Sequence, residues 1–128
     1  MTDSVLTLVT EAGVAAVEGS PGQPLMARPE DATAILEACF SHDVRSALLY
    51  AENMTPGFFD LSSRDAGAIL QRLRNYGVRL VVVCPPGAAQ FSRRFGEMLA
   101  EERQGWHFAV VESRAAALEW LRSRSRRP

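Results

Sequence analysis

The side chains best suited to chemistry stand where strands of this chain are expected to end. Glu52 and Asn53 follow one apolar run, and Cys84 closes another. Ligands of parallel α/β sheets bind beyond the carboxyl ends of the strands, so these residues are expected to line one crevice. A carboxylate there could move protons, and a thiol could act as a nucleophile if a nearby base or helix end lowered its pKa.

The partners that such chemistry needs are not evident from the spacing. The two histidines, His42 and His107, fall in an expected loop and an expected strand, and neither is placed to pair with Cys84. The second cysteine, Cys39, lies on an expected helix, so buried thiols are favoured over a catalytic pair or a zinc site. We therefore predict no catalytic residue, no metal and no cofactor. The carboxylates that could still converge for acid–base work, or serve structural roles, are Glu52, Asp60, Asp65 and Glu112.

Two serines mark the expected start of a helix. Ser62 and Asp65 have the spacing of a capping box, in which each side chain accepts a hydrogen bond from the other residue's backbone N–H. A helix start also presents unpaired N–H groups and the positive end of the helix dipole, which attract an anion or a covalently attached phosphate. Ser62 and Ser63 are therefore candidates for a binding or regulatory role, and plain capping is the alternative.

An aromatic pair, Phe58 and Phe59, lies in the loop NMTPGFFD that ends at Asp60. Adjacent side chains do not bury in one place unless the loop folds back, so we expect one of the two rings to be in the core. The other is either core as well or an exposed anchor for a protein partner or a second copy of the chain. Phe58, Phe59 and Asp60 are therefore included among the candidate binding residues.

The elements that position these residues can be read from the spacing of apolar side chains. Strands are expected over residues 5–10, 14–18, 46–51, 78–84 and 106–111, with a tight turn at 11–13. Helices are expected from Pro29, from Ser62, around Phe91 and after Ser113. The order β-β-α-β-α-β-α-β-α predicts an α/β fold with a mixed, mostly parallel sheet of about five strands, an N-terminal hairpin and about four helices.

One segment is decisive for this arrangement. Residues 78–84, VRLVVVC, form the densest β-branched run in the chain. Such a run is typical of a strand covered on both faces, so we expect it in the middle of the sheet, with the serine-led helix opening beside its end. Residues 1–122 are expected to form a single domain, and residues 123–128 a basic, disordered tail.

The amino-acid composition and the net charge exclude several classes of function. Hydrophobic residues make up 47% of the chain, which supports a core without disulfides, and the net charge of −1 does not attract nucleic acid or anionic membranes. All 14 basic residues are arginine, which excludes a Schiff-base lysine or a phosphate-loop lysine. No apolar run approaches the length of a membrane span and no signal peptide is evident, so we expect a cytoplasmic protein. The arginine-rich tail could contact nucleic acid, but the neutral overall charge argues against it.

Two stretches carry a family resemblance. One has FFDL at 58–61 followed by AGAIL at 66–70, and the other combines NYGV at 75–78 with AAALEWL at 115–121. Together they resemble the bacterial domain-of-unknown-function family numbered 4180, over residues 45–122 and more loosely over the whole chain. That family has no established function, so the resemblance implies a fold rather than an activity.

The element order is also similar to that of anti-sigma-factor antagonist (STAS-like) domains. Their regulatory serine or threonine lies where a strand-end loop opens a helix, as Ser62 and Ser63 are expected to do here. This chain departs from their Asp-Ser-Ser/Thr-Gly spacing, because Leu61 follows Asp60 and Gly67 comes later. The resemblance implies a non-catalytic protein-interaction or regulatory module, with a protein partner or a homodimer. The alternative is a small enzyme or ligand-binding domain that uses the strand-end crevice.

Overall fold

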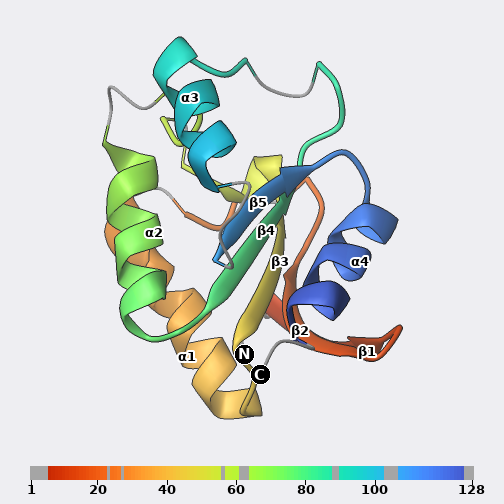
Figure 1. The fold of residues 1–128 in the computed structure, drawn as a ribbon. Helices are drawn as coiled ribbons and strands as arrows, with labels where there is room; N and C mark the ends of the chain where they lie inside the picture. The colour runs from red at the N-terminus through yellow and green to blue at the C-terminus, as the bar shows by residue number, and fades with distance from the viewer. Residues whose placement is uncertain are drawn as a thin grey trace.

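Strands and helices alternate along the chain and form a sheet with helices on both faces (Figure 1). The computed structural model describes residues 6–22, 24–26, 28–55, 57–60, 64–87, 90–102 and 107–125. Its five strands lie in the order β1-β2-β3-β4-β5. Only the first pair is antiparallel, and the other three pairs are parallel. The predicted α/β fold, with its mixed sheet and N-terminal hairpin, is therefore confirmed.

The chain opens with the hairpin of β1 (Leu6–Glu11) and β2 (Val14–Gly19). Ala12 and Gly13 connect the strands, with φ angles of 56° and 79°. Two successive left-handed residues are the signature of a type I′ turn, whose twist matches that of the strands it joins. This turn fixes the register in which Glu11 is paired with Val14.

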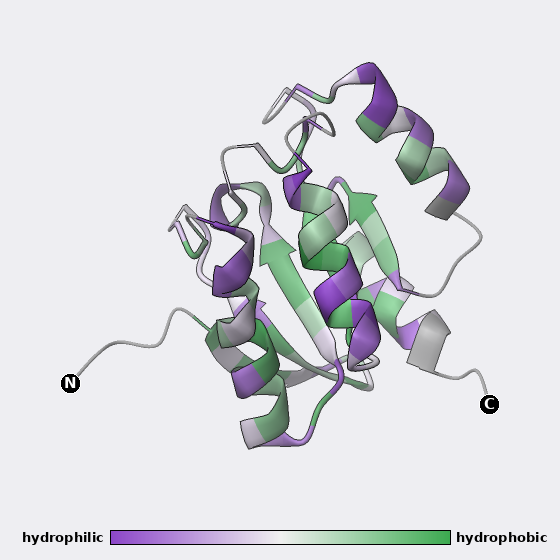
Figure 2. Cartoon of the chain, turned by 90° about the vertical axis from the view of Figure 1, so that its left-hand side faces the viewer, coloured by the Kyte–Doolittle hydropathy of each residue, from purple (hydrophilic) through white to green (hydrophobic). Residues whose placement is uncertain are grey.

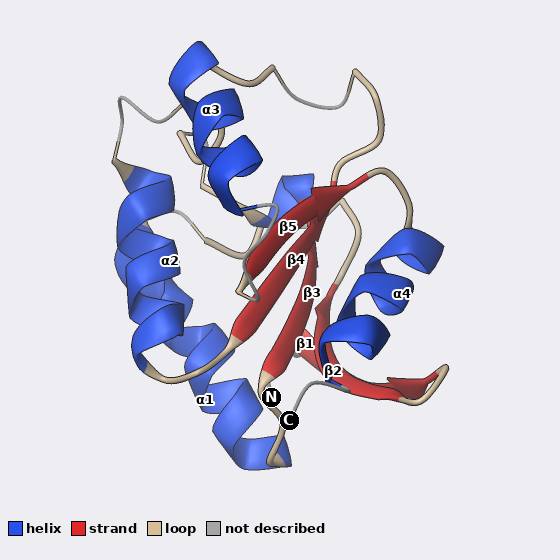
Figure 3. Ribbon diagram, in the orientation of Figure 1, coloured by secondary structure: helices blue, strands red, loops and turns tan. Residues whose placement is uncertain are grey.

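The parallel part of the sheet consists of β3 (Ser46–Tyr50), β4 (Arg79–Val83) and β5 (Phe108–Val111). Residues Leu80 to Val83 of β4 are buried because the strand has a neighbour on each side and helices on both faces (Figure 3). The expectation of a strand covered on both faces is confirmed. The middle strand is β3, however, and β4 lies one place from the centre.

The helices are distributed unequally between the two faces. The longer helices are α1 (Thr33–His42), α2 (Asp65–Asn75), α3 (Arg93–Glu102) and α4 (Arg114–Ser125), and the two short 3₁₀ helices are η1 (Pro29–Ala32) and η2 (Ala51–Asn53). Side chains of α1, α2 and α3 pack in one core with β3 and β4, whereas α4 alone packs on the opposite face. Figure 2 shows the apolar strands between the helices that cover them. No described helix is both long and apolar enough to cross a bilayer.

Several element ends differ from the sequence analysis. Helix α2 begins at Asp65, and its N-cap is Arg64 in a left-handed conformation (φ 68°) rather than Ser62. Ser62 and Ser63, with Leu61, lie outside the described residues. Helix α4 continues to Ser125, so residues 123–125, expected to be tail, are helical. The expected cap at Ser113 is confirmed, because its Oγ accepts a hydrogen bond from the backbone N–H of Ala116 at 3.1 Å.

Candidate functional site

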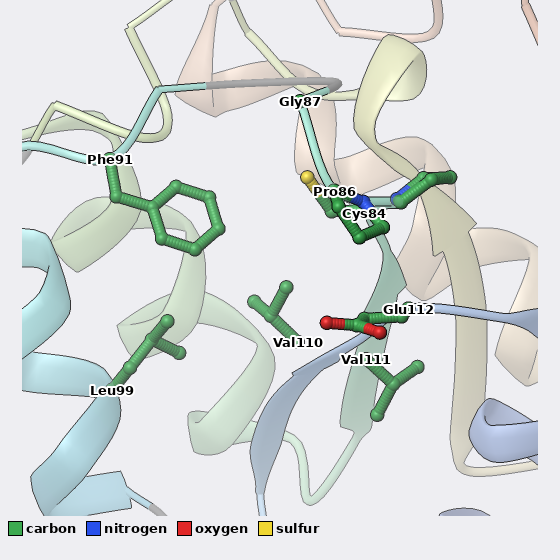
Figure 4. Close-up of a pocket in the computed structure, with 9 residues that line it drawn as sticks. Cys84, Pro86, Gly87, Phe91, Leu99, Val110, Val111 and Glu112 are labelled. Atoms are coloured by element: carbon green, nitrogen blue, oxygen red, sulfur yellow. The ribbon is translucent and has the colours of Figure 1, made fainter.

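A pocket lies at the carboxyl ends of β4 and β5, where the sequence predicted a crevice (Figure 4). Its volume is about 250 Å³. Most of its lining is apolar, and the lining residues are Cys84, Pro85, Pro86, Gly87, Phe91, Leu99, Val110, Val111 and Glu112. Figure 4 shows the Glu112 carboxylate directed toward the pocket interior. Of the six candidate binding residues that the structure describes, Cys84 is the one that lines this pocket.

The thiol of Cys84 is a poor nucleophile in this setting. Cys84 is only 7% exposed, and burial, together with the negative charge of Glu52, raises the pKa of its thiol. Burial likewise raises the pKa of Cys39 to about 11. Catalytic thiols require the opposite shift, toward the thiolate at neutral pH. Both cysteines therefore stay protonated near pH 7.

Asn53 holds the backbone of two loops together. Its Oδ1 accepts a hydrogen bond from the backbone N–H of Tyr50 at 2.8 Å, and its Nδ2 donates to the backbone carbonyl of Ser20 at 2.8 Å. Its own carbonyl accepts hydrogen bonds from the N–H groups of Leu25 and Met26. The side chain is fully buried, so these contacts satisfy polar groups that water cannot reach. The geometry therefore gives Asn53 a structural role.

Glu52, which is exposed, makes a second contact with the loop that follows β2. Its Oε1 accepts a hydrogen bond from the backbone N–H of Gly22 at 3.3 Å. Asp65 also has a structural contact, because its Oδ2 accepts a hydrogen bond from the Thr55 hydroxyl at 2.7 Å. Asp60 is exposed at the end of its loop. Of the four carboxylates considered from the sequence, the structure therefore places Glu112 in the pocket and gives Glu52 and Asp65 contacts that hold loops.

Both rings of the Phe58–Phe59 pair are buried, at 0% and 8% exposure. The loop folds back, so that the two rings pack edge to face with centroids 5.1 Å apart. Phe59 stacks on Phe91 and also contacts Phe95, and Phe58 contacts Phe95 and Phe108. Of the two alternatives left open by the sequence, the exposed anchor is therefore wrong for either ring. The pair belongs to an aromatic cluster that forms one wall of the core beside the pocket.

A polar network that the sequence did not predict joins the hairpin, β3 and the start of α4. Arg114 donates to both oxygens of Glu18, at 2.8 and 3.1 Å, and to both oxygens of Glu11, at 3.1 and 3.0 Å. The Tyr50 hydroxyl donates to the same Glu18 oxygen as Arg114 Nε. These residues are far apart along the chain, and no spacing rule connects them. The network fastens the N-terminus of α4 to the hairpin.

The network shifts the ionisation of its members. Burial alone would raise the pKa of Glu18, but hydrogen bonds from Arg114 and Tyr50 outweigh it and hold the pKa below its ordinary value. Burial and the neighbouring Glu18 raise the pKa of Tyr50 to about 12. The hydrogen bonds to Glu18 and Glu11 raise the pKa of Arg114. At neutral pH Glu18 and Glu11 are therefore ionised and paired with Arg114. A carboxylate with a lowered pKa that is paired in this way is poorly suited to act as a general base.

We predict that the fold loses stability in acid and that Arg114 determines how steeply it does so. The folded state holds the pKa of Glu18 below 4.5, so in acid the unfolded state binds more protons than the folded state. The free energy of unfolding should therefore fall as the pH drops below about 4.5. In the variant Arg114→Gln this decline should become shallower, because Glu18 loses the partner that lowers its pKa. Urea unfolding between pH 2.5 and 7 measures both slopes, and parallel curves for the two proteins would contradict the prediction.

Among the described residues, no group of three or more His, Cys, Asp or Glu side chains is arranged to hold a metal ion. The profile of the family described as "Domain of unknown function (DUF4180)" matches residues 11–121. Comparison with the curated proteins found no match, and neither did comparison with the solved structures. The resemblance to STAS-like domains stays a prediction.

Proposed function

The chain belongs to the DUF4180 family of domains of unknown function, and we propose that it is a non-catalytic interaction module that binds an acidic, partly apolar segment of a protein partner. The observation that supports this is an exposed aromatic pair beside an arginine, at the end of the molecule opposite the pocket. A regulatory role in the bacterial cytoplasm, as the STAS-like resemblance implies, is part of the proposal.

The aromatic pair consists of Phe40, in the last turn of α1, and Tyr76, which follows α2. Their rings pack edge to face with centroids 5.7 Å apart. Phe40 is 55% exposed and Tyr76 is 52% exposed. Phe40 lies at helical spacing from the buried residue Leu36, but its ring is exposed in the structure. Aromatic residues are enriched at protein interfaces, and tyrosine and arginine are enriched among the residues that contribute most to binding.

Positive charge lies beside the pair. Arg45 is exposed, and its Nη1 is 3.3 Å from the position that a Cβ atom would take on Gly77, next to Tyr76. The backbone carbonyl of Arg45 accepts a hydrogen bond from Arg79, the first residue of β4. We call Phe40, Arg45 and Tyr76 the aromatic–arginine surface. An arginine beside aromatic rings suits a partner whose carboxylates pair with the guanidinium while its apolar side chains cover the rings.

Several groups that could have supported catalysis have other roles. The Cys84 thiol is protonated at neutral pH, Asn53 holds loop backbone, and Glu18 is paired with Arg114. These contacts favour a binding module over an enzyme. Ser62 and Ser63 remain proposed regulatory positions.

Peptide binding tests the proposal directly. The probe is a fluorescein-labelled peptide of alternating Asp and Leu residues, and its affinity is measured by fluorescence anisotropy. Phe40→Ser or Arg45→Glu should weaken binding by about tenfold or more, since the loss of an interface anchor costs about 2 kcal/mol or more. The matched control is Arg93→Glu, which makes the same charge change on a 93% exposed side chain of α3.

Added salt should also weaken binding of this peptide, because screening reduces the attraction to Arg45. A peptide of alternating Lys and Leu residues should bind far more weakly. Equal binding of the two peptides, or equal affinities for Arg45→Glu and Arg93→Glu, would contradict the proposal.

The pocket supports a second candidate function. Its volume of about 250 Å³ is slightly below the range of about 300 to 1,000 Å³ that is typical of small-molecule sites. Its lining is apolar apart from Glu112 and the backbone around Cys84. A fragment-sized apolar ligand with a positive group would therefore fit it best, with the positive group against the Glu112 carboxylate.

A further inference from the structure

We propose that β1 is a self-association edge, at which two copies of the chain pair their β1 strands in antiparallel orientation about a two-fold axis at Leu8. Within the described residues β1 is an end strand of the sheet, and β2 is the strand that it pairs with. The pairing would join the sheets of the two copies into one. This inference does not depend on the aromatic–arginine surface, which lies on other elements.

The hairpin turn determines which backbone groups of β1 face outward. Glu11 and Val14 flank a two-residue turn and so exchange hydrogen bonds with each other. Hydrogen-bonded pairs alternate along an antiparallel ladder, so Val9 and Thr7 also bond to β2. The N–H and C=O groups of Leu8 and Thr10, which lie between them, therefore point away from β2.

This outward pattern is complementary to itself. When Leu8 lies opposite Leu8 of a second copy, each can donate its N–H to the other's C=O, as in a hydrogen-bonded pair. The same register brings the outward-facing N–H and C=O of Thr10 beside the β1 strand of the second copy. A two-fold axis requires such self-complementarity, because the same surface serves both partners.

The side chains of β1 also favour pairing. Leu8 is 40% exposed, and the two-fold axis would place it against Leu8 of the second copy. The strand LTLVTE contains no lysine or proline, and its register with β2 is continuous, so it lacks the usual devices that block edge pairing. Its one charge, Glu11, lies at the hairpin end and is paired with Arg114 at 3.0 Å. Like charges therefore do not meet at the axis.

The other end strand is less suited to this role. β5 has four residues, whereas β1 has six, so a ladder built on β5 would have fewer hydrogen bonds. We therefore assign the second copy to β1.

Sedimentation velocity of the full chain over a range of concentrations tests the inference. The wild type should sediment as a dimer at the higher concentrations. Leu8→Lys should raise the dissociation constant at least tenfold, because it brings two like charges together at the axis. Thr10→Pro should act similarly by removing an outward N–H that β2 does not use. Arg93→Glu should leave the dimer unchanged. Circular dichroism confirms that each variant is folded.

Hydrogen exchange of the wild type adds a test that needs no variant. In the dimer, the amides of Leu8 and Thr10 should exchange as slowly as those of Thr7 and Val9, and dilution should accelerate exchange at Leu8 and Thr10 but not at Thr7 and Val9. A wild type that remains monomeric at every concentration would overturn the inference. A dimer in which the Leu8 and Thr10 amides exchange rapidly would overturn it too, because another surface would then hold the two copies together.

Discussion

Replacing Gly19 with alanine is expected to lower the free energy of unfolding by about 2 to 4 kcal/mol, because each buried polar group left unsatisfied costs about 1 to 3 kcal/mol. A Cβ atom at this position would lie 2.2 Å from Oδ1 of Asn53 and 3.0 Å from Cδ2 of Leu49. Asn53 would have to move, and its hydrogen bonds to Tyr50 and Ser20 would be lost. Urea unfolding followed by circular dichroism measures the change.

The matched control is Gly67→Ala, which makes the same substitution on α2. No atom lies within 4 Å of the Cβ position of Gly67, which is exposed. Alanine is a better helix former than glycine by about 1 kcal/mol, so this variant should be more stable than the wild type. Equal stabilities for Gly19→Ala and the wild type would show that Asn53 does not hold the loop as described.

The second large effect is expected for Phe58→Ala, which should destabilise the fold by about 3 to 5 kcal/mol. The Phe58 ring is fully buried and contacts three other phenylalanine rings, with centroids 5.1 to 6.0 Å away. Removing it leaves a cavity between the loop, α3 and β5 that rigid neighbours cannot fill. Thermal and urea unfolding both report the loss.

Phe40→Ala is the appropriate comparison for this variant. Phe40 is 55% exposed and contacts Tyr76 rather than the buried cluster, so its removal should cost less than about 1 kcal/mol. Equal losses of stability in Phe58→Ala and Phe40→Ala would contradict the assignment of Phe58 to the core and of Phe40 to the surface.

The sequence was sufficient to predict the layered fold, because each element carried a local signal. The β-branched run of residues 78–84 indicated β4, and the Ala12–Gly13 turn indicated the hairpin. Gly77 follows α2, and its φ of 72° is typical of the left-handed glycine that ends a helix. Signals of this kind depend only on residues that are close together in the chain. They can therefore be recognised in the sequence without knowledge of the tertiary structure.

The arrangement of side chains was harder to predict, because it depends on contacts between distant segments. Phe40 has the helical spacing that is typical of a core residue of α1, but the end of α1 extends past the sheet (Figure 1) and the ring is exposed. The link from Arg114 to Glu11 and Glu18 joins residues about a hundred positions apart, and no local pattern encodes it. Asn53 was selected for its position at a strand end, yet its amide is used to bind Tyr50 and Ser20.

The central claim is that the binding surface lies at the Phe40–Tyr76 end of the molecule and not at the strand-end pocket. The most direct measurement is a two-dimensional NMR titration of the isotope-labelled chain with the Asp–Leu peptide, which reports the site of binding residue by residue. We predict that the largest shifts fall at Phe40, Arg45 and Tyr76. Shifts confined to Cys84 and Val110–Glu112 would contradict the claim and place the binding site in the pocket.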